Sequence, residues 1–252
     1  MIARDRPTLP EDVGGLFDFA FSIYGRRIGL YAGVAFGGLV IQAVAALVVS
    51  QAPTLQSLPS LLPILNVVVD AIIIGIVSIG MFADVATNTP LTTRQIVAAT
   101  SERLPLLLCI NLIVSFAAVL APADVSASEI GFAVFTLPLI AVFFGALGFA
   151  TVIAAVEPSS SPFISFVRSF GMSLRVSLVA PNFGRTAILG AGVLCVLLME
   201  VVLRDQLKLR GVHGYEFWAN IPLDALVVGP LQALFTVFYL DFKRRIEAAA
   251  RN

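Results

Sequence analysis

Three carboxylates stand inside long apolar runs of this sequence, at Asp70, Glu200 and Asp224, and Asn66 lies one helical turn before Asp70. Ionisable residues are rare in segments that lie in lipid, and they often mark the path of an ion or proton. Carboxylate and amide oxygens at a shared depth could bind a cation or relay a proton. The same carboxylates could instead reach the interface or lie at helix starts, where the helix dipole favours negative charge.

A second group of charged residues lies at the opposite ends of the apolar runs. Asp84 and Glu157 end two of these runs, where the helix dipole disfavours a negative charge by about 0.3 to 1 kcal/mol. Each carboxylate therefore needs a cationic partner, and Asp241 has a local one in Arg245 at i,i+4 spacing. The arginines expected in the same layer are Arg94, Arg103, Arg168, Arg175 and Arg185. We expect a structural ring or, alternatively, a site for lipid headgroup phosphates.

No arrangement of residues in the sequence predicts an enzyme. The single histidine, His213, has no second histidine with which to bind a metal, and it belongs to no serine–histidine–carboxylate pattern. A glycine loop suited to phosphates is also missing. Cys109 and Cys195 both fall in apolar runs and should pack in the core as small hydrophobic side chains. We therefore expect no catalytic residue, no metal and no cofactor.

Composition indicates that lipid surrounds these residues. Hydrophobic residues make up 58% of the chain and charged residues 13%, and the mean hydropathy is +0.96, whereas soluble domains carry about 25% charged residues. About 20 apolar residues of helix cross a hydrocarbon core of about 30 Å. We predict six such spans, at 28–49, 64–84, 104–120, 130–156, 186–203 and 219–240.

Basic residues are distributed unevenly between the two sides of the predicted bundle. Six spans place both termini on one side, and that side carries 13 of the 16 lysines and arginines. The other side carries only Arg204, Lys208 and Arg210. Because lysine and arginine accumulate in cytoplasmic loops, both termini are predicted to be cytoplasmic. The formal net charge is zero and the basic residues are dispersed, which argues against a nucleic-acid partner.

Each outward-going span follows a segment that predicts a short amphipathic helix on the cytoplasmic side. These helices are expected to start near Leu9, Thr93 and Pro162. Capping-box spacing supports two of the starts, through Thr8 with Glu11 and through Thr92 with Gln95.

The predicted fold is therefore all-α, a polytopic membrane bundle of about six transmembrane helices with three short cytoplasmic interfacial helices. We expect a single integral membrane domain over residues 1–252. Its parts are an N-terminal interfacial helix at 1–27, the six-span bundle at 28–240 and a cytoplasmic tail at 241–252.

Four glycines recur at intervals of four residues around the start of the first span, at Gly25, Gly29, Gly33 and Gly37. On a helix this spacing makes a smooth stripe, and such stripes let a second helix approach closely within lipid. The stripe predicts packing against another helix of the same chain or, alternatively, docking of another protein or a second copy.

Three short motifs accompany this order of segments. They are LFDFAFSIY at 16–24 followed by Arg26 and Arg27, AVE at 155–157 followed by FVRSF at 166–170, and YLDFKRRIE at 239–247. The chain resembles bacterial membrane proteins related to the membrane domain of some glycerophosphoryl diester phosphodiesterases. The resemblance implies a compact six-helix domain in a bacterial inner membrane. The soluble phosphodiesterase domain that gives the group its name is not part of this sequence, so no catalytic function carries over.

Three functions are compatible with the sequence. The first is a non-catalytic membrane subunit or scaffold, whose partners are the lipid bilayer and either other membrane subunits or further copies of itself. The second is a small ion-coupled transporter that uses Asp70, Glu200 and Asp224, and the third is an anionic-lipid-binding protein that uses the arginine layer. We favour the first, because the residues offer no chemistry.

Overall fold

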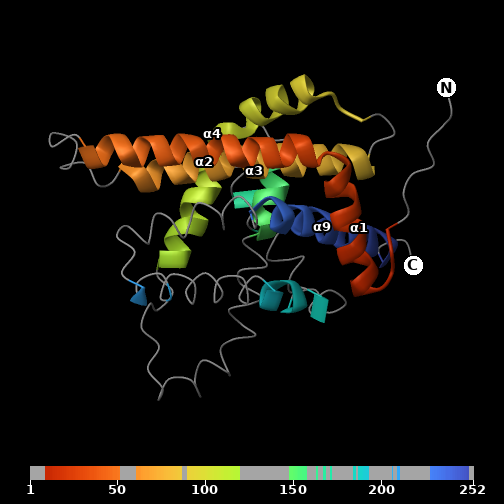
Figure 1. The fold of residues 1–252 in the computed structure, drawn as a ribbon. Helices are drawn as coiled ribbons and strands as arrows, with labels where there is room; N and C mark the ends of the chain where they lie inside the picture. Colours follow the sequence, from red (N-terminus) through yellow and green to blue (C-terminus); the bar gives the residue numbers. More distant parts are fainter. Residues whose placement is uncertain are drawn as a thin grey trace, which may run out of the picture.

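The structure is a computed structural model, and its described residues form helices and no strand (Figure 1). It describes residues 9–51, 61–86, 90–119, 148–157, 163, 167–168, 171, 184–185, 187–192, 206, 209–210 and 228–249. The five long helices are α1 (Val13–Arg26), α2 (Ile28–Gln51), α3 (Leu61–Ala86), α4 (Thr93–Val119) and α9 (Gly229–Ala249).

Three helices are long and apolar enough to cross a bilayer, which supports a membrane protein. Their apolar windows are Ile28–Ala45 in α2, Ile64–Ala86 in α3 and Thr93–Ile113 in α4. The first two match the predicted spans at 28–49 and 64–84, whereas the third begins at Thr93, well before the predicted span at 104–120. Of the other predicted spans, residues 148–156, 187–192 and 229–240 are described and helical. The remaining parts of those spans lie outside the described residues.

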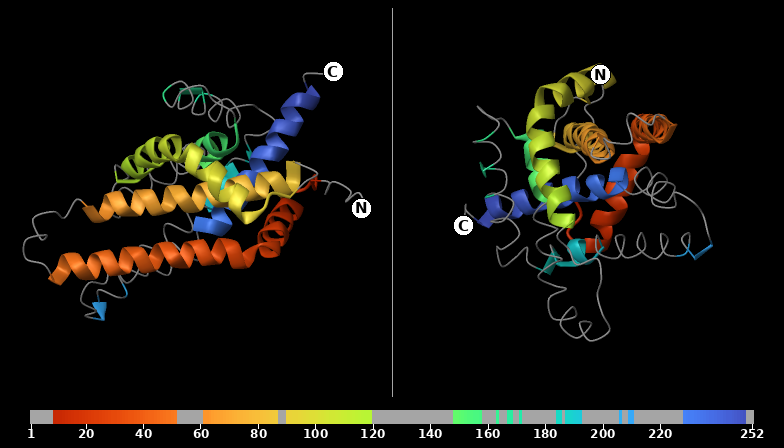
Figure 2. Two further views of the ribbon diagram at one scale, coloured as in Figure 1. Left: turned by 90° about the horizontal axis from the view of Figure 1, so that it is seen from above. Right: turned by 90° about the vertical axis from the view of Figure 1, so that its left-hand side faces the viewer.

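The chain turns sharply between α1 and α2 (Figures 1 and 2). Asp12 caps the start of α1 by accepting a hydrogen bond from the Gly15 amide at 2.6 Å. The capping box predicted from Thr8 and Glu11 is therefore wrong, because the helix starts four residues later than that spacing requires. Arg27 ends α1 in a non-helical conformation, and α2 begins at the next residue.

Helix α3 is the centre of the described bundle and packs against α2, α4 and α9. Glycines set the close approaches: a Cβ atom at Gly38 would lie 2.4 Å from a Val69 methyl group, and one at Gly80 would lie 2.5 Å from the Tyr31 hydroxyl. Together these contacts make α2 and α3 antiparallel neighbours, and Figure 2 shows them side by side. Helix α4 meets α3 in the same way at Gly75, which faces Thr100.

Helix α4 is one continuous helix from Thr93 to Val119, with Pro105 in its interior. The sequence predicts a short interfacial helix that ends before a separate span at 104–120, and the structure merges the two. Figure 2 shows α4 as a single curved helix beside α3. Pro105 provides a physical reason for the curve, since it removes one backbone hydrogen bond and crowds the preceding turn.

Helix α9 continues to Ala249, so most of the cytoplasmic tail predicted at 241–252 is part of the same helix as the last predicted span. Phe242 stays fully buried, and its ring lies 5.1 Å from that of Phe149. At the same end of the molecule, Phe17 of α1 packs edge to face on Phe238 at 5.5 Å. The core thus joins the first and last helices of the chain.

Candidate functional site

The predicted acidic cluster lies only partly within the described residues. Asp70 and Asn66 are both on α3 and both half-buried. Glu200 and Asp224 lie outside the described residues, so the structure does not test whether the four side chains meet.

Two further amide side chains lie at the depth of Asn66, and the sequence reasoning missed both. Asn111 of α4 donates a hydrogen bond to the carbonyl of Val67 at 3.0 Å. Gln42 is 5% exposed, and its amide nitrogen has no hydrogen-bond partner among the described residues. Gln42 stands roughly 6 Å beyond Gly38 along α2, which places it level with Asn66 in the antiparallel pair. The signal in the sequence is a single amide in each of two apolar runs.

Asp84 at the end of α3 has a well-formed cationic partner. Arg27 donates from Nε and Nη2 to the two carboxylate oxygens at 2.7 Å each. Its third nitrogen, Nη1, donates to the Leu91 carbonyl at 2.9 Å. These hydrogen bonds to Asp84 raise the pKa of Arg27 even though partial burial opposes the charge. The sequence predicts this partner among the arginines from Arg94 to Arg185, and that prediction is wrong.

Glu157 takes its partners from α9. It accepts hydrogen bonds from the Tyr239 hydroxyl at 2.7 Å and from Lys243 Nζ at 2.6 Å. Burial raises the pKa of Glu157, but these two hydrogen bonds and the lysine charge outweigh it and hold the pKa below its usual value. Of the predicted arginine ring, Arg168 acts on Glu157 only through its charge.

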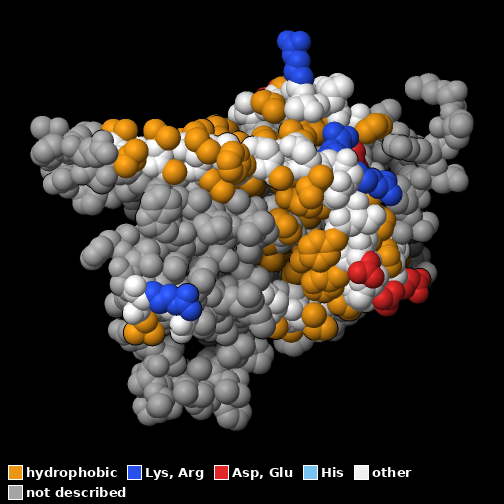
Figure 3. Space-filling model, viewed as in Figure 1, with side chains coloured by type: hydrophobic (Ala, Val, Ile, Leu, Met, Phe, Trp, Pro, Cys, Tyr) orange, Lys and Arg blue, Asp and Glu red, His pale blue; other side chains and the backbone are white. Residues whose placement is uncertain are grey.

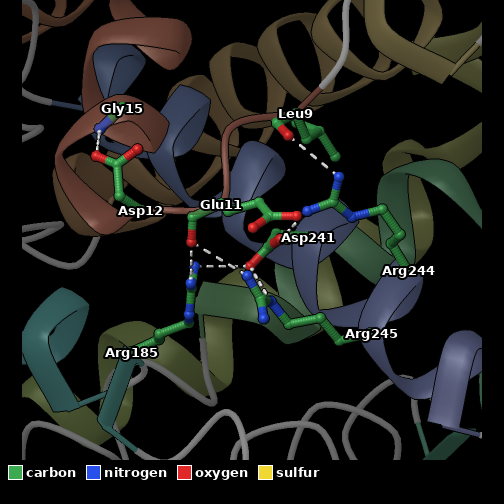
Figure 4. A network of polar contacts seen from close by, with 8 residues as sticks. All are labelled: Leu9, Glu11, Asp12, Gly15, Arg185, Asp241, Arg244 and Arg245. Carbon is green, nitrogen blue, oxygen red and sulfur yellow. Dashed lines mark hydrogen bonds and ion pairs between the residues drawn. The ribbon is translucent and has the colours of Figure 1, made fainter.

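Asp241 is fully buried and accepts hydrogen bonds from three arginines (Figure 4). The donors are Arg185, Arg244 and Arg245, each at 2.9 Å. The i,i+4 pair predicted for Asp241 and Arg245 is confirmed. The same arginines also bind the chain before α1: Arg244 donates to the Leu9 carbonyl at 3.1 Å.

Backbone oxygens of the N-terminal segment complete this network (Figure 4). The Glu11 carbonyl accepts hydrogen bonds from Arg185 and from Arg245, the latter at 3.2 Å. The network therefore pins the start of α1 to α9. We interpret it as structural.

The other members of the predicted arginine ring are placed differently. Arg94 is exposed on the first turn of α4, and Arg103 is half-buried on the same helix. Arg175 lies outside the described residues. Among the four described members of this set, only Arg185 forms an ion pair, and its partner is Asp241 instead of Asp84 or Glu157.

A buried polar group links three helices in the core. Gln232 of α9 donates to the hydroxyl oxygens of Ser78 at 2.7 Å and Thr151 at 3.2 Å. All three side chains are at most 4% exposed. Because each polar atom has a partner, the group holds the helices together without exposing a reactive atom.

The glycine stripe is divided by the turn between α1 and α2. Gly25 belongs to α1, whereas Gly29, Gly33 and Gly37 follow one another along α2. A Cβ atom at any of them would meet no other described residue within 4 Å. Helix α2 packs on α3 through Gly38 instead, so the predicted packing of the stripe within this chain is not present in the described residues. Figure 3 shows apolar side chains along the outer surface of α2.

The described residues contain no group of three or more metal-binding side chains. Of the two cysteines, Cys109 is described and is exposed on α4, so the core position predicted for it is wrong. Comparison of the chain with protein-family models, curated proteins and solved structures finds no match.

Proposed function

We propose that this protein is a non-catalytic integral membrane subunit that packs against a helix of another membrane protein through α2. Its place is a bacterial inner membrane, with both termini in the cytoplasm. The observation that supports the proposal is the row of Gly29, Gly33 and Gly37, against which no described residue packs.

Exposed apolar side chains alone do not argue for docking, because lipid covers them as well as a protein does. Phe36 is 68% exposed and Ile41 is 56% exposed on α2, as is normal for a helix in contact with lipid. Glycines differ, since they lower the stability of a helix and offer lipid little contact area. In a membrane, glycines stabilise a structure when they let the backbone of a second helix approach closely. Three in a row on one face favour a helical partner.

The alternative of an ion-coupled transporter has weaker support. A polar layer lies between α2, α3 and α4 and consists of Asp70, Asn66, Gln42 and Asn111. The other two carboxylates proposed for the transport site, Glu200 and Asp224, lie outside the described residues. The resemblance to the phosphodiesterase-associated membrane proteins also favours a membrane domain without its own chemistry.

The proposal predicts that bulk on the stripe prevents assembly. Gly33→Leu combined with Gly37→Leu should remove a stoichiometric partner from the protein extracted in mild detergent, because the leucines keep the backbones apart. The measurement is particle mass and co-purifying protein by native mass spectrometry. The control is Leu112→Phe, which adds bulk at a 56% exposed apolar position of α4 and should retain the partner.

Two results would contradict the proposal. One is a wild-type protein that is monomeric and carries no protein partner, which would shift attention to transport. The other is an assembly that survives both leucine substitutions while the variant remains helical by circular dichroism.

A further inference from the structure

A cavity of about 310 Å³ lies between the end of α3, the first half of α4 and residues 155–156. Its walls are mostly apolar, and Phe82, Leu91, Ala99 and Val156 contribute to them. Two charged residues, Glu102 and Arg103, also line it. Its volume is at the lower end of the range of small-molecule sites, about 300 to 1,000 Å³. It therefore accommodates part of a chain-like ligand.

Arg103 differs from the other partly buried cations at this end of the bundle. Arg27, Arg185 and Lys243 each pair with a carboxylate. Arg103 is half-buried beside the cavity, and none of the hydrogen bonds and ion pairs of the described residues involves it. A guanidinium that is partly removed from water without an anion is unfavourable. The cavity thus holds a cation suited to an anionic oxygen, above all a phosphate, which arginine binds with two parallel hydrogen bonds.

The place of the cavity defines the rest of the ligand. It lies beside the last two turns of α3, where the apolar window ends at Ala86, next to the ion pair of Arg27 and Asp84. This is the boundary between hydrocarbon and water for a spanning α3. A ligand at this depth meets apolar walls on one side and Arg103 on the other. Basic pockets between transmembrane helices on the cytoplasmic side bind lipid headgroups by the same principle.

Glu102 determines which headgroup charge the cavity favours. It stands next to Arg103, so the two charges at the cavity cancel. A phosphate on Arg103 would leave the carboxylate of Glu102 as the nearest uncompensated charge. This favours a headgroup that adds a cation to the phosphate over one whose net charge is negative.

We propose that this cavity binds a phospholipid with a primary amine in its headgroup, with the phosphate on Arg103, the ammonium on Glu102 and one acyl chain along the apolar walls. The proposal requires that α3 and α4 lie in a bilayer, but it is independent of whether α2 docks a partner.

The test is native mass spectrometry of the full-length protein, purified in mild detergent and exposed to equal amounts of phosphatidylethanolamine and phosphatidylglycerol. Wild-type protein should retain one phosphatidylethanolamine per chain. Arg103→Gln should weaken retention by about tenfold or more, since a hydrogen-bonded charge pair is lost. The matched control is Arg94→Gln, an exposed arginine of the same helix outside the cavity, which should retain the lipid.

A second pair of variants tests the cavity without changing charge. Ala99→Phe should fill the cavity and exclude the acyl chain, whereas Ala98→Phe adds the same ring at an exposed neighbouring position and should not. Glu102→Gln should shift the preference towards phosphatidylglycerol. Inorganic phosphate in large molar excess should fail to displace the lipid, because it lacks the apolar part.

Retention equal to wild type in both Arg103→Gln and Ala99→Phe would overturn the site. Displacement of the lipid by inorganic phosphate would overturn the lipid as the ligand and identify the ligand as a free anion. A wild-type preference for phosphatidylglycerol would overturn the role of Glu102. Circular dichroism of each variant separates lost binding from lost folding.

Discussion

The carboxylate of Asp241 pairs with more cationic side chains than any other described acid in the molecule. It is fully buried, and Arg185, Arg244 and Arg245 all donate to it. The three guanidiniums repel one another, and two of them also depend on the Glu11 carbonyl. Asp241 is therefore the residue that makes this cluster of cations compatible with a folded chain.

Asp241→Asn should lower the free energy of unfolding by about 3 kcal/mol, near the lower end of the effect of breaking a buried ion pair, because the arginines keep some contact with water. Thermal unfolding in detergent measures the loss. Glu247→Gln changes an exposed acid on the same helix and should stay within about 0.5 kcal/mol of wild type. Equal unfolding temperatures for Asp241→Asn and wild type would show that the network contributes nothing.

Glu157 should make stability depend on pH. Its pKa is lower in the folded protein than the reference value of 4.5, so its contribution is present above pH 4.5 and is lost as the pH falls through the folded pKa. Glu157→Gln should therefore unfold at a lower temperature than wild type at pH 7, and the difference should shrink in acid below pH 4.5. A difference that stays constant from pH 7 into this range would contradict the ion pair with Lys243.

Single residues show what local spacing can predict. The capping box of Thr92 and Gln95 is confirmed, since the two side chains and backbones exchange hydrogen bonds. So is the pair of Asp241 and Arg245, one helical turn apart. The partner of Asp84 lies 57 residues away, and no local pattern connects the two. The need for a cation at a helix end was predictable from the dipole, but its identity depended on which helices pack together.

At the scale of helices, some glycines are closely packed against a neighbouring helix and others contact no described residue. Gly75 on α3 faces α4, where an added Cβ atom would lie 2.6 Å from a Thr100 methyl group and 2.8 Å from Leu107. Gly33 on α2 faces no described residue. The sequence pattern emphasises Gly33, because it lies in a row of four, yet α3 packs through isolated glycines.

Gly75→Ala should therefore lower the free energy of unfolding by about 1 to 3 kcal/mol, because α3 and α4 must move apart to fit the methyl group. Gly33→Ala should not lower it, since the methyl group meets no described atom and alanine favours the helix. Thermal unfolding of both variants, in detergent and without a partner, makes the comparison. Equal losses in the two variants would contradict the packing of α3 on α4.

The boundaries of helices were predicted less well than their presence. The break expected before residue 104 is absent, because the polar first turns of α4 join its apolar part without a cap between them. Helix α9 also continues beyond residue 240, where the last predicted span ends. Of the charges after residue 240, Lys243 pairs with Glu157 and Asp241 pairs with Arg185, while Arg244 and Arg245 pair with Asp241 within α9. Phe242 beside them is buried.

For the whole molecule, apolar length was enough to predict helices that are long and apolar enough to span a membrane at α2, α3 and, with a later start than the structure shows, α4, since the thickness of a bilayer sets that length directly. It could not show that α3 would be central or that α1 and α9 would meet. Those arrangements depend on side-chain shape and on contacts between distant residues. The cavity beside Arg103 was unpredictable for the same reason, because its walls come from three separate segments.

The contacts between α1 and α9 determine when this protein can finish folding. Arg245 and its acceptor Glu11 are separated by 234 residues, and a ribosome adds about 5 to 20 residues per second. The start of the chain therefore waits on the order of 10 to 50 s for its partner to be made. During that interval Leu16, Ala20 and Ile23 of α1, which are fully buried in the finished protein, lack the cover of α9. The membrane surface or a chaperone must cover this apolar face of α1 until α9 has been synthesised.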